Sequence, residues 1–343
     1  MGAGLARSGL GKRTALGTAT LLIGANLPDV DILAYLDGPA ADLSFRRGWT
    51  HGIPALLVLP FVLTGLMLLF DRAVRRLGHA ALPSGVEPRQ ILLLAAVSIL
   101  THPMLDTLNT YGVRWLMPLR GDWFYGDTLF IVDPWLWLIL GLGVARSRSG
   151  RGSRGSTAAA TRPARTALVV SGAYVAAMLL AGVTSGRIAR GELAALGGAP
   201  IERLMVGPRL LTPFTRSVVA LQGGVYRVGS FRWLRRPHVE TASLRTFPAP
   251  RPDDPLLIAA RTTTLGRRFL GWARFPTVQV EPNPAGGSLV HLIDLRYADR
   301  PGAGFGSVTI PLPELTLPAP PASAPSRDTS PPSPPAGSAA RRR

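Results

Sequence analysis

The sequence predicts a mostly α-helical, polytopic membrane bundle of about five spans, followed by a small β-rich extracytoplasmic domain and a disordered tail. Three observations support this fold class. Of the 343 residues, 47% are hydrophobic, and the mean hydropathy of +0.22 is high for a soluble protein. The first half contains apolar runs close to the roughly 20 residues that a membrane-spanning helix needs. After residue 186 the apolar runs become short and strand-like.

Five apolar segments are the expected membrane spans. The second and the fifth contain no charged residue, whereas each of the other three carries at least one aspartate near an end. An aspartate at this depth is costly unless it is paired or bound to a cation. The five segments comprise residues 14–35, 53–70, 90–108, 128–145 and 166–184.

Arginine counts in the loops predict the orientation of the spans. The loops after the second and the fourth span are rich in arginine, and positive charge marks cytoplasmic loops. The loops between the first and second spans and between the third and fourth have balanced charge. We therefore expect the balanced loops, and the domain after the fifth span, on the extracytoplasmic side.

The expected domain organisation follows from changes in composition. The chain divides into a membrane-embedded domain (residues 1–145), an Arg-rich cytoplasmic loop (146–165), a final transmembrane helix (166–185), a β-rich domain (186–317) and a tail (318–343). Alternating polarity and glycine-marked turns predict strands at residues 225–233, 277–280, 289–297 and 307–310. The tail is rich in Pro, Ser and Ala, so it cannot bury a core and should be disordered.

Composition also limits the chemistry. The net charge of +18 comes almost entirely from arginine, because Lys12 is the only lysine. The arginines are spread along loops and tail instead of forming one patch, so no nucleic-acid partner is expected. The chain has no cysteine, and a metal site must therefore use His, Asp, Glu or water as ligands.

Six ionisable residues gather at the outward ends of the expected spans. With the predicted orientation they lie at one level of the membrane, where several charged groups together indicate mutual pairing or a bound cation. We expect them to be the ligands of a metal site. They are Asp29, Asp31, His51, His102, Asp106 and Asp133.

His102 and Asp106 are the most informative pair. They are four residues apart, so on a helix they stand one turn apart on the same face and can share one metal ion. The alternative is an imidazole bonded to a carboxylate inside the bundle. Nearby Thr101, Asn109 and Thr110 could donate hydrogen bonds to such ligands.

The three remaining aspartates each have a structural alternative. Asp29 and Asp31 stand where a helix is expected to end, so both could face one cavity, or they could simply mark the helix terminus. Asp133 precedes Pro134, and this order is typical of a helix N-cap that needs no metal.

Residues 46–51 supply His51 together with two arginines. An arginine such as Arg47 can hold a phosphate or carboxylate through two parallel hydrogen bonds. The alternative is an interfacial tryptophan flanked by arginines whose charged ends reach water. The other histidines are expected to be structural or solvated; they are His79, His238 and His291.

These motifs together resemble the YdjM family of LexA-regulated, membrane-bound, predicted metal-dependent hydrolases. The resemblance covers residues 2–145 strongly and residues 213–229 more loosely. That family is grouped by distant likeness with zinc-dependent phospholipases C and related nucleases, so the resemblance implies zinc, phosphodiester chemistry, a bacterial inner membrane and a link to the SOS response. It rests on the segments PDVD (28–31), RGWTH (47–51), HPMLD (102–106), NTYG (109–112) and DP (133–134).

The sequence departs from this family in one respect. A short Thr-His-containing segment usually precedes the stretch that here forms residues 1–11, and the given sequence does not contain it. We therefore expect Met1 to be an internal methionine, with a short helix and one further histidine ligand ahead of it in the full protein.

The sequence thus predicts a membrane-bound hydrolase that cleaves a lipid or lipid-linked phosphoester with metal-activated water. Zinc is the expected cofactor, membrane lipids are the expected partners, and the oligomeric state is left open. The expected catalytic residues are Asp29, Asp31 and Arg47. The rival interpretation is a non-enzymatic scaffold or partner-binding protein with a structural His/Asp cluster. Transport ranks third, because the second and fifth spans are uninterrupted and no internal repeat is found.

Overall fold

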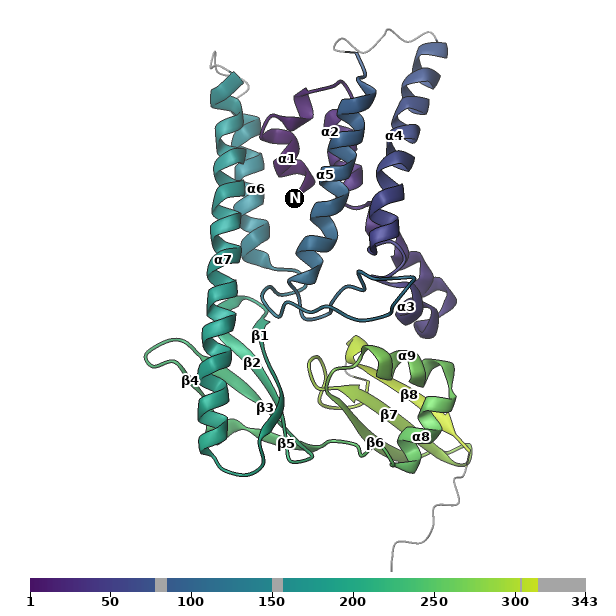
Figure 1. The fold of residues 1–343 in the computed structure, drawn as a ribbon, viewed down its shortest axis with the longest axis vertical. Coiled ribbons are helices and arrows are strands. Elements are labelled where there is room, and N and C mark those ends of the chain that lie inside the picture. The colour runs from purple at the N-terminus through teal and green to yellow at the C-terminus, as the bar shows by residue number, and fades with distance from the viewer. Residues whose placement is uncertain (78–84, 150–156, 303, 314–343) are drawn as a thin grey trace, which may run out of the picture.

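The computed structural model describes residues 1–77, 85–149, 157–302 and 304–313. His79 and the expected disordered tail (318–343) lie outside the described residues. The helices occupy one end of the molecule and two β-containing modules occupy the other (Figure 1). Helix α7 (Thr157–Ala195) joins the two ends, because it runs beside α6 and then continues along the first sheet.

Three described helices are long and apolar enough to cross a membrane. They are α4 (Ile53–Arg76), α5 (Pro88–Thr107) and the Ala158–Ala195 part of α7. A fourth crossing is added if α2 (Gly17–Gly24) and η2 (Leu27–Asp37), which meet at a bend of 41°, form one span. The structure therefore supports three to four spans, and the five expected from the sequence are not confirmed.

When the bent pair counts as one span, the difference lies in the fourth expected span. Helix α6 (Pro134–Ser149) has 16 residues, which at about 1.5 Å per residue gives about 24 Å, short of the hydrocarbon thickness of about 30 Å. It begins later than expected because Asp133 caps its first turn: its Oδ1 accepts hydrogen bonds from the N–H groups of Trp135 (3.1 Å) and Leu136 (2.9 Å).

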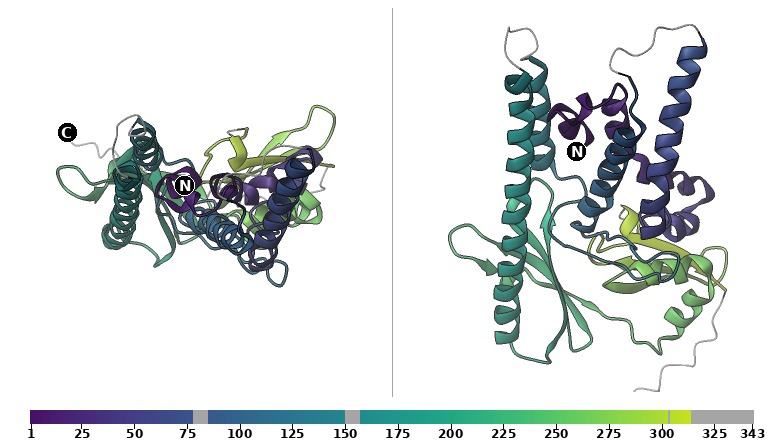
Figure 2. Two further views of the ribbon diagram at one scale, coloured as in Figure 1. Left: turned by 90° about the horizontal axis from the view of Figure 1, so that it is seen from above. Right: turned by 45° about the horizontal axis from the view of Figure 1, so that its top comes forward.

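The helices form two pairs around the N-terminal segment, which consists of α1 (Gly2–Arg7), η1 (Leu10–Lys12) and α2. Seen from above, α6 and α7 lie on one side of this segment, and α4 and α5 lie on the other (Figure 2). Many side chains on the outer face of α4 are exposed and apolar, as expected of a helix that faces lipid.

Proline explains the bend between α2 and η2. Pro28 has no N–H to donate, and the N–H of Asp29 bonds to the carbonyl of Asn26 (3.1 Å) instead of that of Ala25. The Ala25 carbonyl is thus left without a backbone donor from the next turn. The short helix α3 (Pro39–Phe45) follows η2 at the same end of the bundle as the β modules.

The first β-containing part, which we call the sheet module, is an antiparallel sheet that covers the C-terminal half of α7. Its order is β1-β2-β3-β4, with β5 also paired to β3. Ala189 and Leu193 of α7 pack against Val218 and Phe231 of the sheet. The strands are β1 (Ile201–Arg209), β2 (Thr212–Gln222), β3 (Val225–Arg232), β4 (His238–Val239) and β5 (Arg245–Pro248).

The second part, which we call the α/β module, is a three-stranded antiparallel sheet with two short helices on one face. Phe269 and Trp272 of α9 are buried against Val290 and Ile310 of the sheet. Its elements are α8 (Pro255–Thr262), α9 (Thr264–Trp272), β6 (Pro276–Pro282), β7 (Ser288–Asp294) and β8 (Ser307–Leu312). The four strand segments expected from the sequence overlap β3, β6, β7 and β8, whereas β1, β2, β4, β5 and the two helices were not expected.

Candidate metal centre

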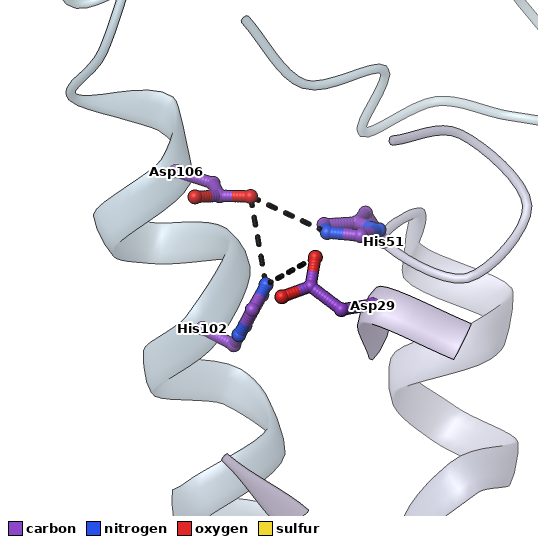
Figure 3. Close-up of side chains that lie close together, drawn as sticks. All are labelled: Asp29, His51, His102 and Asp106. Carbon is purple, nitrogen blue, oxygen red and sulfur yellow. Dashed lines mark ion pairs between the residues drawn. The ribbon is translucent and has the colours of Figure 1, made fainter. Parts of the chain in front are cut away.

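Four of the six expected ligand residues meet in the structure. Helix α5 carries His102 and Asp106 one turn apart, η2 supplies Asp29, and His51 comes from the loop ahead of α4 (Figure 3). One possible ligand atom from each of these residues lies within 4.8 Å of those from the other three. We call this group the His/Asp cluster.

The imidazole Nε2 atoms and the carboxylates face one another. Oδ2 of Asp106 lies 3.4 Å from Nε2 of His51 and 3.5 Å from Nε2 of His102, and Oδ1 of Asp29 lies 3.3 Å from Nε2 of His102. His51 is fully buried, whereas the side chain of Asp29 is 55% exposed. The cluster therefore has a closed side at His51 and an open side at Asp29.

The Nδ1 atom of each histidine, which faces away from the cluster, has a hydrogen-bonding partner of its own. Nδ1 of His102 lies 2.7 Å from the carbonyl oxygen of Ala25, which can only accept, so the ring donates there and its Nε2 carries the lone pair when the ring is neutral. Nδ1 of His51 lies 2.9 Å from the hydroxyl of Thr50 and 3.2 Å from Oδ2 of Asp31. This is how metal-binding histidines are usually oriented.

Three buried atoms of the cluster form no hydrogen bond. They are Nε2 of His51, Nε2 of His102 and Oδ2 of Asp106. Buried polar atoms are almost always hydrogen-bonded, because leaving one unsatisfied costs about 1–3 kcal/mol. Here the three atoms point at one another, and two nitrogens with two carboxylates are a donor set that divalent transition metals accept. The residues therefore fit a metal ion.

Arg47 is fixed beside the cluster. Its backbone has a left-handed φ of 51°, which is uncommon for a residue other than glycine. Its N–H donates to Oδ2 of Asp31 (2.7 Å), its Nη1 donates to Oδ1 of Asn109 (3.0 Å), and its Nη2 lies 3.2 Å from Oδ2 of Asp106. The guanidinium thus stands next to a carboxylate of the His/Asp cluster, and it has N–H donors left for another group.

The cluster opens into a cavity of about 400 Å³. Asp29, His102, Asp106 and both arginines of the Arg46-Arg47 pair line its polar part. Apolar side chains line much of the rest of the cavity. Three of them are largely exposed at the surface of the helical part. These are Ile32 (56% exposed), Val132 (50%) and Trp137 (68%).

The remaining two expected ligands lie outside the cluster. Oδ2 of Asp31 accepts from the Arg47 N–H and from the hydroxyl of Thr50 (2.9 Å), so this carboxylate supports His51 from behind. Asp133 lines the cavity, but its carboxylate caps α6 and accepts a hydrogen bond from the hydroxyl of Tyr174 (3.0 Å to Oδ2). In this arrangement other groups engage both carboxylates, and their direct binding to a metal stays a prediction.

Sequence reasoning found Asn109 as a polar neighbour but missed Thr50 and the Ala25 carbonyl. Thr50 stands directly before His51, and that adjacency is the signal that could have found it. The role of the carbonyl depends on the bend at Pro28. His238 and His291 lie in the β modules, away from the cluster, as expected.

Comparison with known proteins agrees with the motifs. A curated relative, the uncharacterized protein YfhP of Bacillus subtilis (strain 168), is 24% identical over 117 residues, which are 34% of this chain and 32% of the relative. The matched region thus spans about a third of the relative's length. No solved structure matches the chain. The family model of the YdjM inner membrane protein matches residues 1–186, more than half of the chain, so this protein belongs to the YdjM family.

Proposed function

We propose that the protein is a membrane-bound, metal-dependent hydrolase that cleaves a phosphoester of a lipid or lipid-linked molecule. The observation that carries the proposal is the convergence of three unsatisfied buried atoms, Nε2 of His51, Nε2 of His102 and Oδ2 of Asp106, beside the fixed guanidinium of Arg47. A metal ion would satisfy all three atoms at once.

Zinc is the proposed metal. His51, His102, Asp106 and Asp29 would hold it, and nitrogen and carboxylate ligands without thiolates suit this ion. When bound, the ion would make a water molecule nucleophilic near neutral pH and withdraw charge from a phosphoryl oxygen.

The residues of the chain have separate tasks in this proposal. Asp29 is the most exposed carboxylate of the cluster and stands at the cavity, where a carboxylate oxygen can accept a proton from water. Arg47 holds a non-bridging phosphoryl oxygen with its free N–H groups. Asp31 and Thr50 keep His51 in the required orientation.

The cavity favours an amphipathic substrate. Its polar part holds the cluster and the arginines, while Ile32, Val132 and Trp137 form an apolar edge that is exposed on the helical part. A phosphoester can reach the cluster through this edge while its hydrocarbon tail stays in the membrane. We propose that the cluster and both β modules are extracytoplasmic and that the membrane is the bacterial inner membrane.

Metal content tests the proposal first. Elemental analysis of the detergent-solubilised protein should find near-stoichiometric zinc, which His102→Ala should abolish. His291→Ala is the matched control, because this buried histidine lies in β7 outside the cluster and its loss should leave zinc in place. Wild-type protein that binds no divalent metal would contradict the proposal.

Hydrolysis is tested next on vesicles that contain a fluorescent phosphodiester lipid. Arg47→Lys should lower kcat/KM by roughly 10- to 100-fold, the range expected for losing a charge-assisted hydrogen bond of about 1.5–3 kcal/mol, without loss of zinc. Equal rates of lipid hydrolysis by the wild type and by His102→Ala would mean that the His/Asp cluster does not catalyse this reaction.

One observation favours the non-enzymatic alternative. The ion pairs of His51 with Asp31 (3.2 Å) and of His102 with Asp29 (3.3 Å) can hold the helices together without a metal. A purely structural cluster would tolerate a chelator, whereas a metal centre would not.

A further inference from the structure

Arginine and aromatic side chains alternate where the α/β module meets the loop after α5. The ring of Tyr111 lies in the middle: its centroid is 5.0 Å from that of Trp272, and Cζ of Arg47 lies 4.8 Å from it. On the side of the α/β module, the guanidinium of Arg296 lies against the rings of Trp272 and Tyr297 (4.7 and 5.0 Å from Cζ to the centroids).

Three hydrogen bonds run from the α/β module to two consecutive residues of this loop. Nε1 of Trp272 donates to the carbonyl of Tyr111 (3.2 Å), and Nη1 of Arg296 donates to the carbonyl of Thr110 (2.6 Å). The hydroxyl of Tyr297 donates to Oγ1 of Thr110 (2.9 Å). Burial raises the pKa of Tyr297, so the hydroxyl keeps its proton and remains a donor.

Arg296 is fully buried with Asp294. Burial alone would lower the pKa of Arg296, but the carboxylate 2.7 Å away raises it above its ordinary value, so the guanidinium stays charged. A buried ion pair needs its remaining donors satisfied, and here the carbonyls of Thr110 and Trp272 accept them. The pair is therefore organised around its contact with the loop.

The same loop holds Arg47 on its other side. Oδ1 of Asn109 accepts three hydrogen bonds: from the N–H of Tyr111 (2.8 Å), from the N–H of Gly112 (3.2 Å) and from Nη1 of Arg47 (3.0 Å). A shift of Thr110 or Tyr111 would therefore move both the acceptor and the ring that hold the guanidinium.

We propose that the α/β module positions Arg47 beside the His/Asp cluster. Its residues Trp272, Arg296 and Tyr297 fix the loop, and Asn109 and Tyr111 of that loop hold the guanidinium of Arg47. The need for a fixed Arg47 rests on the proposed function, whereas the positioning itself is a property of the fold. None of the three residues lines the cavity, so they act on Arg47 through the loop and not by touching a bound group.

The reactivity of Arg47 tests the positioning without any substrate or metal. Trp272→Phe with Tyr297→Phe removes two of the three hydrogen bonds and keeps most of the packing and the buried ion pair. Phenylglyoxal should then modify Arg47, buried in the wild type, at least about tenfold faster. Mass spectrometry locates the modified arginine, and an unchanged rate at Arg47 overturns the proposal.

Two controls separate positioning from loss of folding. Trp233→Phe with Tyr226→Phe makes the same chemical changes in the sheet module and should leave the rate at Arg47 unchanged. Arg216, buried in β2, should stay protected in every variant. If Arg216 and Arg47 are both modified faster in the Trp272→Phe, Tyr297→Phe protein, the two changes destabilise the fold as a whole, and the proposal is contradicted.

Phosphate affinity then tests whether the module acts through Arg47. Inorganic phosphate should bind the zinc-loaded Trp272→Phe, Tyr297→Phe protein about tenfold more weakly than it binds the wild type. In an Arg47→Met background, the proteins with and without these two changes should bind phosphate with the same affinity. Equal losses in both backgrounds overturn the proposal. If the wild type binds neither zinc nor phosphate, the proposed function fails, and the reactivity of Arg47 still decides the positioning.

Discussion

Nδ1 of His102 lies 2.7 Å from the carbonyl oxygen of Ala25, 77 residues earlier in the chain. This contact joins α5 to the end of α2 and turns Nε2 of His102 toward Asp29 and Asp106. It exists because, at the bend next to Pro28, the N–H of Asp29 bonds to the carbonyl of Asn26 and leaves that of Ala25 free. The bend in the first apolar segment therefore orients a histidine of the His/Asp cluster in the third.

Pro28→Ala should weaken zinc binding without touching a ligand. The alanine restores an N–H, α2 can continue, and the Ala25 carbonyl becomes engaged within the helix. We expect an affinity loss of about 10- to 100-fold, as for other residues that orient a metal-binding histidine, measured by competition with a zinc indicator. Pro60→Ala, which removes a proline inside α4, is the control and should bind zinc normally.

Asp31→Asn should also weaken zinc binding by about 10- to 100-fold, although Asp31 lies outside the cluster. The amide keeps the shape of the side chain but loses the negative charge behind His51. Stoichiometry at saturating zinc should remain that of the wild type. A protein that can no longer be saturated would show that Asp31 is a ligand itself.

Asp133→Ala should lower stability and spare the metal. The change removes the cap of α6 and the acceptor for the hydroxyl of Tyr174, with an expected cost of about 1–2 kcal/mol. Thermal unfolding in detergent measures the cost. Asp254→Ala removes a comparable cap from α8 and should cost a similar amount. Loss of zinc in Asp133→Ala but not in Asp254→Ala would show that Asp133 binds the metal.

Removal of the metal should lower the unfolding temperature of the wild type but not that of His51→Ala. A ligand present at about 1,000 times its Kd stabilises the folded state by about 4 kcal/mol, which a strong chelator removes. Differential scanning fluorimetry with and without chelator makes the comparison. The same temperature in both conditions for the wild type would favour the structural interpretation of the cluster.

The sequence predicted the parts of the site that depend on local spacing. His102 and Asp106 stand one turn apart because four residues make one helical turn, and His51 and Asp29 reach them because the apolar segments place all of these residues near one level. The separate places of Asp31 and Asp133 depend on individual hydrogen bonds, to Thr50 and to the first turn of α6, which residue type alone does not determine.

In the fold, too, the sequence predicted the elements that have a local pattern and missed those that do not. Apolar runs predicted α4 and α5, but α6 is shorter than its apolar segment because the cap at Asp133 fixes its start. In the second half, β3 and β6 to β8 follow alternating patterns, whereas β2 is buried along most of its second half and lacks alternation there. The contact of the α/β module with Tyr111 joins residues far apart in sequence and has no local signal.

The hydrogen bond from Arg296 to Thr110 joins residues 186 positions apart, so it cannot form until long after Thr110 has been synthesised. A chain that grows by about 5–20 residues per second needs roughly 10 to 40 s to make Arg296 after Thr110. During that interval the residues of the His/Asp cluster and the direct partners of Arg47 have all been synthesised, but the α/β module is incomplete. The cluster can therefore assemble before Trp272, Arg296 and Tyr297 form their hydrogen bonds to the loop at Thr110 and Tyr111.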